Sequence, residues 1–337
     1  MEKPDMRLVG VGGRHATSGP LWDSFCDGMN KVLDPLYGSQ ESAIAKIKEG
    51  ADREAFALVS NEFPDTAMGV LVYKTTPVDE VEKRGVAKAL EIKSLFLTDA
   101  KSSSKRGGGS IMLARCAEAA LKLGANALLV SVDNKVYDSK AFFRVKGFVD
   151  LGEKSTSSKK DGEKWYACLV RKPKRIPIYR QYYELILHGR KPWEGRINKG
   201  AFRYLREGDQ LEFYRGEEKF FASLSKRREF RTFEEMIRDI GVRPLLPDKG
   251  SMPPAEAVEL YRSFPGYRDQ ESIHGVVAFC VYPLQTFDSF EIPRWVAELV
   301  EKRNNASRQD RGHRRRRDEY EDRHDRYDRP YKSHRRY

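Results

Sequence analysis

Three consecutive glycines, Gly107 to Gly109, separate a strand-like apolar run from a run with apolar residues at helical spacing. Glycines let backbone N–H groups converge on a bound anion, and the N-terminus of a following helix adds positive potential. Lys105 and Arg106 precede the glycines and add two positive charges. The pattern predicts a pyrophosphate site, and its alternative is a flexible solvated loop. The spacing fits neither a Walker loop nor a Rossmann fingerprint.

A second group of charged residues lies in the segment 189–196, where Lys191, Glu194 and Arg196 stand close together. A strand beginning near Trp193 places Glu194 and Arg196 on one face, with Lys191 at its entrance. Residues 173–231 hold 15 Lys and Arg against 8 Asp and Glu. This excess predicts phosphate contacts on one side of the module, and the alternative is a surface salt bridge.

The last segment, residues 302–337, carries 14 Lys and Arg against 7 Asp and Glu, which is +7 of the net charge of +12. It has almost no apolar residues, so we expect a disordered tail. Its arginines and tyrosines can contact phosphate and stack on unpaired bases, or the tail only confers solubility. Its three histidines are too widely spaced for a convincing metal site, and we predict no metal.

The chain has 337 residues, enough for about two domains, and no apolar run approaches the length of a membrane span. The start of the sequence lacks the pattern of a secretory leader. Four cysteines are scattered singly, which argues against a disulfide framework or a zinc ribbon. We expect a soluble protein of a reducing compartment without membrane contact: cytoplasmic, or nuclear if the source is eukaryotic.

Apolar periodicity predicts an α/β domain over residues 1–172, an α+β small barrel over 173–301 and the tail over 302–337. The basic stretch 171–177 is interpreted as a linker. Expected strands are 55–60, 69–73, 90–97, 127–132, 148–152, 165–171, 210–214, 220–224 and 275–281. Expected helices are 21–36, 42–49, 110–123, 139–145, 179–187, 232–240, 254–263 and 293–302.

Residues 56–148 resemble the Gcn5-related N-acetyltransferases, or GNAT enzymes, whose signature is Gln/Arg-x-x-Gly-x-Gly/Ala after the fourth strand. Ser104 to Gly109 fit that register, and Asn134 and the pair Gly147-Phe148 match the distal part of the pattern. The resemblance implies that acetyl-CoA binds with its pyrophosphate at the glycine turn and its acyl carbonyl between splayed fourth and fifth strands. The implied cofactor-binding residues are Leu97, Thr98, Asp99, Lys105, Arg106, Gly107, Gly108, Gly109, Ser110 and Asn134.

The same resemblance implies two catalytic residues. Glu91 stands near the start of the fourth strand, where several members place a carboxylate that takes a proton from the acceptor amine. A raised pKa would suit that role, and the alternative is an exposed strand carboxylate. Phe143 replaces the tyrosine that commonly protonates the departing thiolate, so Tyr137 is the substitute acid, with an ordinary surface tyrosine as the alternative. Ser104 replaces the Gln or Arg of the signature.

Residues 176–284 resemble the ASCH domains, relatives of the PUA-like RNA-binding barrels. The matching features are Lys191-x-x-Glu194-x-Arg196, the Gly208-Asp209 turn, the segment 233–237 before Pro244, Tyr261 and the run 275–278. The resemblance implies binding of RNA or a modified nucleotide beside Lys191, Glu194 and Arg196. Some relatives hydrolyse acetylated cytidine with a Lys, a Thr and a Glu, but Glu194 stands at the Thr position.

These observations together predict an acetyl-CoA-dependent N-acetyltransferase coupled to an ASCH module that binds RNA or a nucleotide-bearing substrate. One alternative is an RNA-binding protein whose GNAT domain holds acyl-CoA without efficient catalysis. The other is an ASCH-type amidohydrolase of acetylated nucleosides. The acceptor amine is not identified by the sequence.

Overall fold

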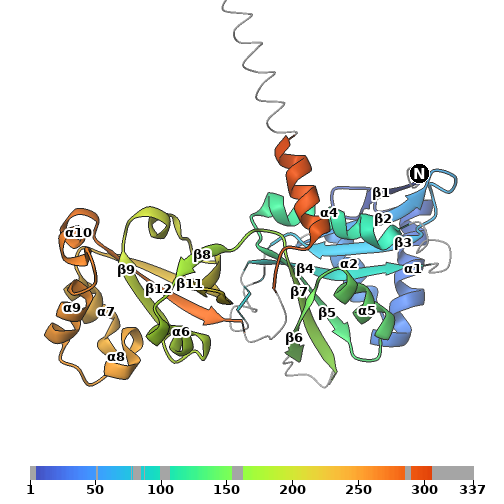
Figure 1. The fold of residues 1–337 in the computed structure, drawn as a ribbon. Helices are drawn as coiled ribbons and strands as arrows, with labels where there is room; N and C mark the ends of the chain where they lie inside the picture. The colour runs from blue at the N-terminus through green and yellow to red at the C-terminus, as the bar shows by residue number, and fades with distance from the viewer. Residues whose placement is uncertain are drawn as a thin grey trace, which may run out of the picture. The chain divides into compact units, whose positions relative to one another are not determined.

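The computed structural model describes residues 5–50, 52–76, 78, 85–86, 88–98, 107–153, 162–284 and 290–305. A compact unit ends at Pro293, and residues 294–305 form a helix that belongs to a second unit, so each unit is described by itself. The compact unit contains two sheets, of seven and five strands (Figure 1).

The first sheet has the strand order β1-β2-β3-β4-β5-β7-β6. It is mixed, because β4 and β5 run parallel while the other neighbouring strands are antiparallel. Its strands are β1 (Met6–Val11), β2 (Arg53–Ser60), β3 (Gly69–Lys74), β4 (Ala89–Leu97), β5 (Ala127–Asp133), β6 (Val149–Glu153) and β7 (Glu163–Leu169). Its helices are α1 (Pro20–Tyr37), α2 (Glu41–Glu49), α4 (Gly108–Leu123) and α5 (Tyr137–Val145).

Helices cover both faces of this sheet. The apolar side chains of α1 and α2 pack on alternate strand residues such as Val70 and Val72, in one buried cluster. The intervening residues point to the opposite face. There, the Arg115 guanidinium of α4 lies 4.7 Å from the centre of the Phe56 ring. The α/β architecture predicted from the sequence is confirmed.

The second sheet has the order β8-β10-β11-β12-β9 and curls into a half-barrel with β8 and β9 at its edges. Its strands are β8 (Lys174–Pro177), β9 (Trp193–Ile197), β10 (Gln210–Arg215), β11 (Glu218–Phe230) and β12 (Val276–Pro283). Its helices are α6 (Arg180–Leu187), α7 (Phe233–Ile240), α8 (Val242–Leu245), α9 (Pro254–Arg262) and α10 (Tyr267–His274), with 3₁₀ turns η2 (Gly200–Tyr204) and η3 (Pro247–Lys249). The predicted α+β class is confirmed.

Several local predictions are corrected by the structure. The stretch read as a linker contains β8, which pairs with β10 through Lys174–Pro177. The expected strand 220–224 is part of the 13-residue β11, and α10 was not expected. Residues 302–305 of the expected tail are helical, and the rest of the tail lies outside the described residues.

The chain passes from the first sheet to the second between β7 and β8, whereas the division into domains at residue 172 stays a prediction. In the described ranges, no helix is both long and apolar enough to cross a membrane.

Candidate functional sites

The first candidate site lies where β4 and β5 separate. Their pairing ends at Ile92 opposite Val130, although the strands continue to Leu97 and Asp133. A β-bulge at Lys93 interrupts the pairing of β4 with β3 at the same level. Bulges bend a strand and raise its local twist, so this bulge accounts for the divergence. The opening corresponds to the splayed fourth and fifth strands that the GNAT resemblance implies.

The two backbone N–H groups at the end of β4 point in opposite directions. The N–H of Thr98 donates to the carbonyl of Met68, 3.0 Å away, and its hydroxyl donates to Ala67 O at 2.7 Å. Successive N–H groups of a strand point to opposite edges, so the Leu97 N–H points away from β3, toward the side of β5. The Leu97 N–H is thus directed toward the opening, while the amide and hydroxyl of Thr98 are engaged by Met68 and Ala67.

The N-terminus of α4 supplies the expected glycine turn. Gly107 caps the helix with φ of 78°, in the left-handed region that favours glycine, and no side chain caps the helix there within the described ranges. A Cβ on Gly107 would have open space around it. Gly109 is different, because a Cβ there would lie 2.9 Å from Cζ of Phe142. The close approach of Phe142 therefore explains why position 109 needs glycine.

The other predicted cofactor residues divide into two groups. Ser110 lies in the first turn of α4, where its N–H donates to Gly107 O at 3.0 Å, and Gly108 is buried. Asn134 directly follows β5, and its N–H donates to Gly162 O at 2.6 Å. Asp99, Lys105 and Arg106 lie outside the described residues.

Glu91 is buried on β4 between two ammonium groups. Its carboxylate lies 2.9 Å from Nζ of Lys93 and 3.3 Å from Nζ of Lys74. Burial alone would raise the pKa of Glu91, but the two cations outweigh it and lower that pKa below its ordinary value. The raised pKa that would suit a strong base is therefore absent, because Lys93 and Lys74 both lie against the carboxylate. Glu91 is not an exposed strand carboxylate either.

The two aromatic residues near the expected acid position, Phe143 and Tyr137, differ in burial. Phe143 is buried against Phe142 and Phe148, whereas Tyr137 is 75% exposed with Nζ of Lys140 4.4 Å from its ring centre. A further tyrosine, Tyr37, lies half-buried at the end of α1. Burial, followed by the nearby carboxylates of Glu163 and Asp133, raises the pKa of Tyr37.

The second candidate site contains Lys191, Glu194 and Arg196, which the structure brings together as predicted from their spacing. Glu194 lies 3.1 Å from Nζ of Lys191 and 2.7 Å from Nε of Arg196. Burial raises the pKa of Glu194, but the two cations lower it by more, so the pKa lies below its ordinary value. All three side chains are buried, so the surface salt bridge alternative is excluded.

Lys191 has no donor left for a ligand. An ammonium group has three N–H donors, and those of Lys191 serve Trp193 O at 2.7 Å, Leu245 O and the Glu194 carboxylate. The side chain is 1% exposed. Lys191 therefore positions Glu194 and has no N–H group free to donate to a ligand.

Aromatic side chains lie around Lys191, Glu194 and Arg196. The pocket, which we call the aromatic pocket, is lined by Tyr179, Tyr182, Lys191, Glu194, Gly195, Arg196, Tyr261, Phe264 and Tyr267. Its cavity of about 10 Å³ has room for about one water. The hydroxyl of Tyr182 is buried and lacks a hydrogen-bond partner in the described part of the chain. Tyr179 and Phe264 stack at 5.6 Å with an angle of 14°, and Tyr179 is half exposed.

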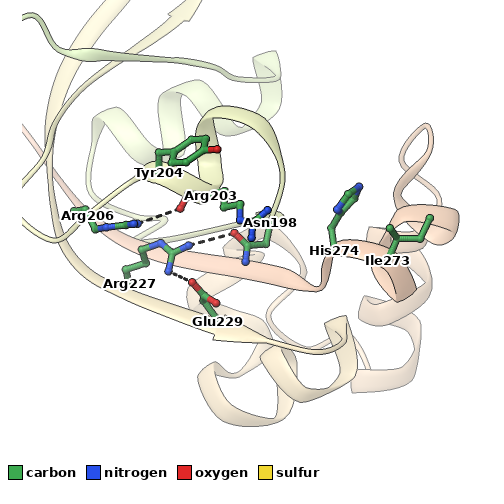
Figure 2. Close-up of a pocket in the computed structure, with 8 residues that line it drawn as sticks. All are labelled: Asn198, Arg203, Tyr204, Arg206, Arg227, Glu229, Ile273 and His274. Carbon is green, nitrogen blue, oxygen red and sulfur yellow. Dashed lines mark hydrogen bonds and ion pairs between the residues drawn. The ribbon is translucent and has the colours of Figure 1, made fainter. Parts of the chain in front are cut away.

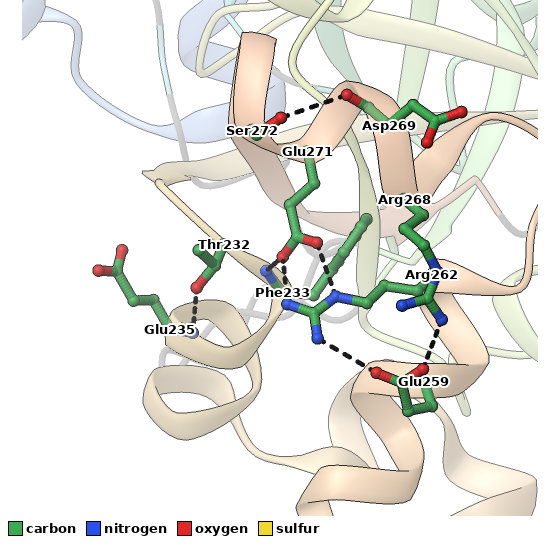
Figure 3. Close-up of polar contacts among 9 residues, drawn as sticks. All are labelled: Thr232, Phe233, Glu235, Glu259, Arg262, Arg268, Asp269, Glu271 and Ser272. Atoms are coloured by element: carbon green, nitrogen blue, oxygen red, sulfur yellow. Dashed lines mark hydrogen bonds and ion pairs between the residues drawn. The ribbon is translucent and has the colours of Figure 1, made fainter.

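A polar clamp fixes the helices behind this pocket (Figure 3). Glu271 of α10 accepts hydrogen bonds from Phe233 N, at the first residue of α7, and from Nε of Arg262 in α9, both at 2.7 Å. Arg262 and Arg268 also pair with Glu259. The clamp therefore joins α7, α9 and α10. Tyr267, the first residue of α10, is hydrogen-bonded to Arg196.

Solved structures similar to parts of this chain fall into two groups. A GNAT-family acetyltransferase from Staphylococcus aureus is 12% identical and covers 49% of this chain and 99% of its own, with a TM-score of 0.37. Arabidopsis thaliana NAA60, solved with a bisubstrate analogue, is 9% identical and covers 49% of this chain and 97% of its own, with a TM-score of 0.39. Protein PF0455 from Pyrococcus furiosus is 27% identical and covers 34% of this chain and 100% of its own, with a TM-score of 0.29.

No family model matches the sequence, and no curated protein matches it. In the described ranges, no group of three or more His, Cys, Asp and Glu side chains is placed to hold a metal ion.

Proposed function

We propose that the chain is an acetyl-CoA-dependent N-acetyltransferase whose second module binds RNA or a nucleotide-bearing substrate. The observation that carries the first part is the divergence of β4 and β5 beside the N-terminus of α4. The observation that carries the second is the aromatic pocket over a buried carboxylate and guanidinium.

The residues around the divergence fit acetyl-CoA in two respects. Gly107 leaves open space before an uncapped helix N-terminus, which suits the pyrophosphate. The Leu97 N–H has the direction needed to donate to a carbonyl between the strands. When bound, acetyl-CoA supplies an acetyl group activated as a thioester. The other residues predicted to contribute to this site are Thr98, Asp99, Lys105, Arg106, Gly108, Gly109, Ser110 and Asn134.

Glu91 is the proposed acceptor of the proton that the amine loses, directly or through water. The carboxylate is ionised at neutral pH because Lys93 and Lys74 lower its pKa, so it is ready to accept a proton but is a weak base. Those lysines are about 30% exposed, so they can move into solvent when a substrate ammonium approaches. Tyr137 remains the proposed acid, and its exposure lets water replace it.

The aromatic pocket supports recognition of a planar base. Aromatic rings stack on unpaired bases, and the free lone pairs of Glu194 can accept hydrogen bonds from a base edge. A base is far larger than the present cavity, so its entry requires the stacked pair Tyr179 and Phe264 to part. Because Lys191 has no free donor, the geometry favours binding over the hydrolytic alternative.

A matched pair of glycine variants tests the cofactor site. Gly107 and Gly124 cap opposite ends of α4, both with left-handed φ and both with open space for a Cβ. Asparagine tolerates this conformation, so Gly107→Asn and Gly124→Asn carry the same backbone strain. We expect Gly107→Asn to weaken acetyl-CoA binding at least tenfold in calorimetry and Gly124→Asn to leave it unchanged, because only the first puts a side chain where the pyrophosphate binds.

Equal affinity in the two variants would reject the pyrophosphate assignment. Turnover is tested separately by mass spectrometry of RNA, protein and small amines incubated with the parent protein and labelled acetyl-CoA. Binding without transfer to any of these acceptors would favour the alternative in which the domain holds acyl-CoA without efficient catalysis.

A further inference from the structure

The half-barrel module contains a second, larger pocket that none of the predicted site residues line. Its volume is about 480 Å³, and its walls come from the end of β9, from η2, from β11 and from the end of α10 (Figure 2). Arg203, Arg206 and Arg227 line it together with Tyr204 and His274, and Glu229 is the single carboxylate of the lining. We call this pocket the arginine groove.

Arg227 is the fixed cation of the groove. Its side chain is 11% exposed. One terminal nitrogen pairs with Glu229 and the other donates to Oδ1 of Asn198 at 3.2 Å. Its Nε is buried and has no hydrogen-bond partner in the described part of the chain. The contacts with Glu229 and Asn198 therefore hold this guanidinium in place in the wall of the groove.

Arg203 and Arg206 are the available cations. The guanidinium of Arg203 is exposed and has no hydrogen-bond or ion-pair partner among the described residues. Arg206 donates from one terminal nitrogen to the carbonyls of Arg203 and Leu205, at 3.1 and 2.8 Å, which leaves its other N–H groups free for an acceptor. Since Glu229 is already paired with Arg227, the groove presents a surplus of positive charge.

We propose that the arginine groove binds the phosphate backbone of a single-stranded polynucleotide next to the nucleotide held in the aromatic pocket. The groove is too large for a single phosphate, and planar guanidinium groups match phosphate oxygens in two-point contacts. Tyr204 is 66% exposed and lies in the sequence between the two available arginines, Arg203 and Arg206. An exposed aromatic ring is a platform for an unpaired base. The inference rests on the proposed nucleotide binding of the module.

The position of the groove supports this continuity. Arg196 lines the aromatic pocket and Asn198 lines the groove, two residues apart and thus about 7 Å along the chain at strand rise. Helix α10 likewise starts at Tyr267 in the aromatic pocket and ends at His274 in the groove. One strand of nucleic acid can therefore contact both places.

The test compares two variants of equal charge in the full chain. Arg203→Gln with Arg206→Gln removes the available cations, while Arg238→Gln with Arg243→Gln removes two exposed arginines from α7 and α8, which do not line the groove. The probes are a 12-nucleotide oligouridylate and uridine monophosphate. We expect the groove variant to bind the oligomer about tenfold more weakly and to reduce the slope of log affinity against log salt by about 1.4, because each lost phosphate contact contributes about 0.7.

The control variant should retain the parent affinity for the oligomer, and both variants should retain that for the mononucleotide. Equal losses in the two variants overturn the proposal, as does polyglutamate of matched charge competing as well as the oligomer. Tyr179→Ala separates this inference from the proposed function. If it weakens neither probe while the groove variant weakens the oligomer, the groove is supported and the nucleotide pocket is rejected.

Discussion

Glu91 and Glu194 are both buried carboxylates held between two cations, yet the cations differ. The lysines paired with Glu91 are 28% and 31% exposed, whereas Lys191 and Arg196 beside Glu194 are 1% and 11% exposed. In the first site the charges remain in contact with water. In the second they are taken out of water and engaged by backbone carbonyls as well as by the carboxylate.

This difference separates two uses of the same charge pattern. Solvated lysines can leave Glu91 at small cost, so its carboxylate is available for proton transfer. Buried cations cannot leave Glu194 without losing most of their compensation, because transfer of a charge from water to the protein interior is costly. Glu194 is therefore a fixed part of the lining of the aromatic pocket. Its contribution to stability should exceed that of Glu91.

The largest expected effect is on unfolding. Glu194→Gln leaves two buried cations without their counter-charge, so we expect the free energy of unfolding to fall by about 3 to 5 kcal/mol. Glu91→Gln leaves two partly solvated lysines, and we expect a loss of about 1 kcal/mol. Urea denaturation of both variants, monitored by circular dichroism, measures the two free energies of unfolding, which are comparable when the denaturant dependence (the m value) is the same for both.

A double variant checks the cause of that loss. Lys191→Met together with Glu194→Gln removes one of the uncompensated charges, so it should recover part of the stability lost by Glu194→Gln alone. Equal losses for Glu194→Gln and Glu91→Gln would contradict the distinction between the fixed and the available carboxylate.

The second effect is on the rate of acetyl transfer. Removing a general base typically lowers the rate by about 100-fold or more, so Glu91→Gln should do so while acetyl-CoA affinity stays constant. Tyr137→Phe should lower the rate only about threefold, because water reaches an exposed hydroxyl and can protonate the leaving group in its place. Single-turnover assays with labelled acetyl-CoA measure both rates, and full activity of Glu91→Gln would remove Glu91 from the mechanism.

The sequence predicted most of the first sheet because its strands are nearly continuous apolar runs bounded by turns. The sequence did not predict the strand Met6–Val11, because Arg7 and Gly10 interrupt its apolar pattern. It also did not predict α10, whose sequence is mostly polar. Helix α10 exists because the buried Glu271 ties it to Phe233 and Arg262. Such a tertiary contact has no signature in local spacing.

The candidate sites were predictable to different depths. Spacing along one strand placed Glu194 and Arg196 on the same face, and the structure agrees. The ion pair of Glu91 with Lys74 was not predictable, because Lys74 lies on the neighbouring strand β3. Together with Lys93, Lys74 reverses the expected direction of the pKa of Glu91. The arginine groove was indicated only as an excess of positive charge, since its residues come from four separate elements.

The smallest effect, and the sharpest test of the available carboxylate, is a pH shift. Lys93 and Lys74 lower the pKa of Glu91 against the opposing effect of burial. Replacing both with methionine leaves burial alone, so the pKa rises above its ordinary value of 4.5. If transfer requires the ionised carboxylate, activity is lost as pH falls through that pKa, and the acid limb of the rate profile should move up by about one pH unit or more. Lys31→Met, on the exposed side of α1, removes a distant charge and should leave the limb in place. The double variant keeps the Glu91 carboxylate and removes both cations, so a limb that reports Glu91 must move. An unchanged limb would therefore mean that a group other than Glu91 titrates.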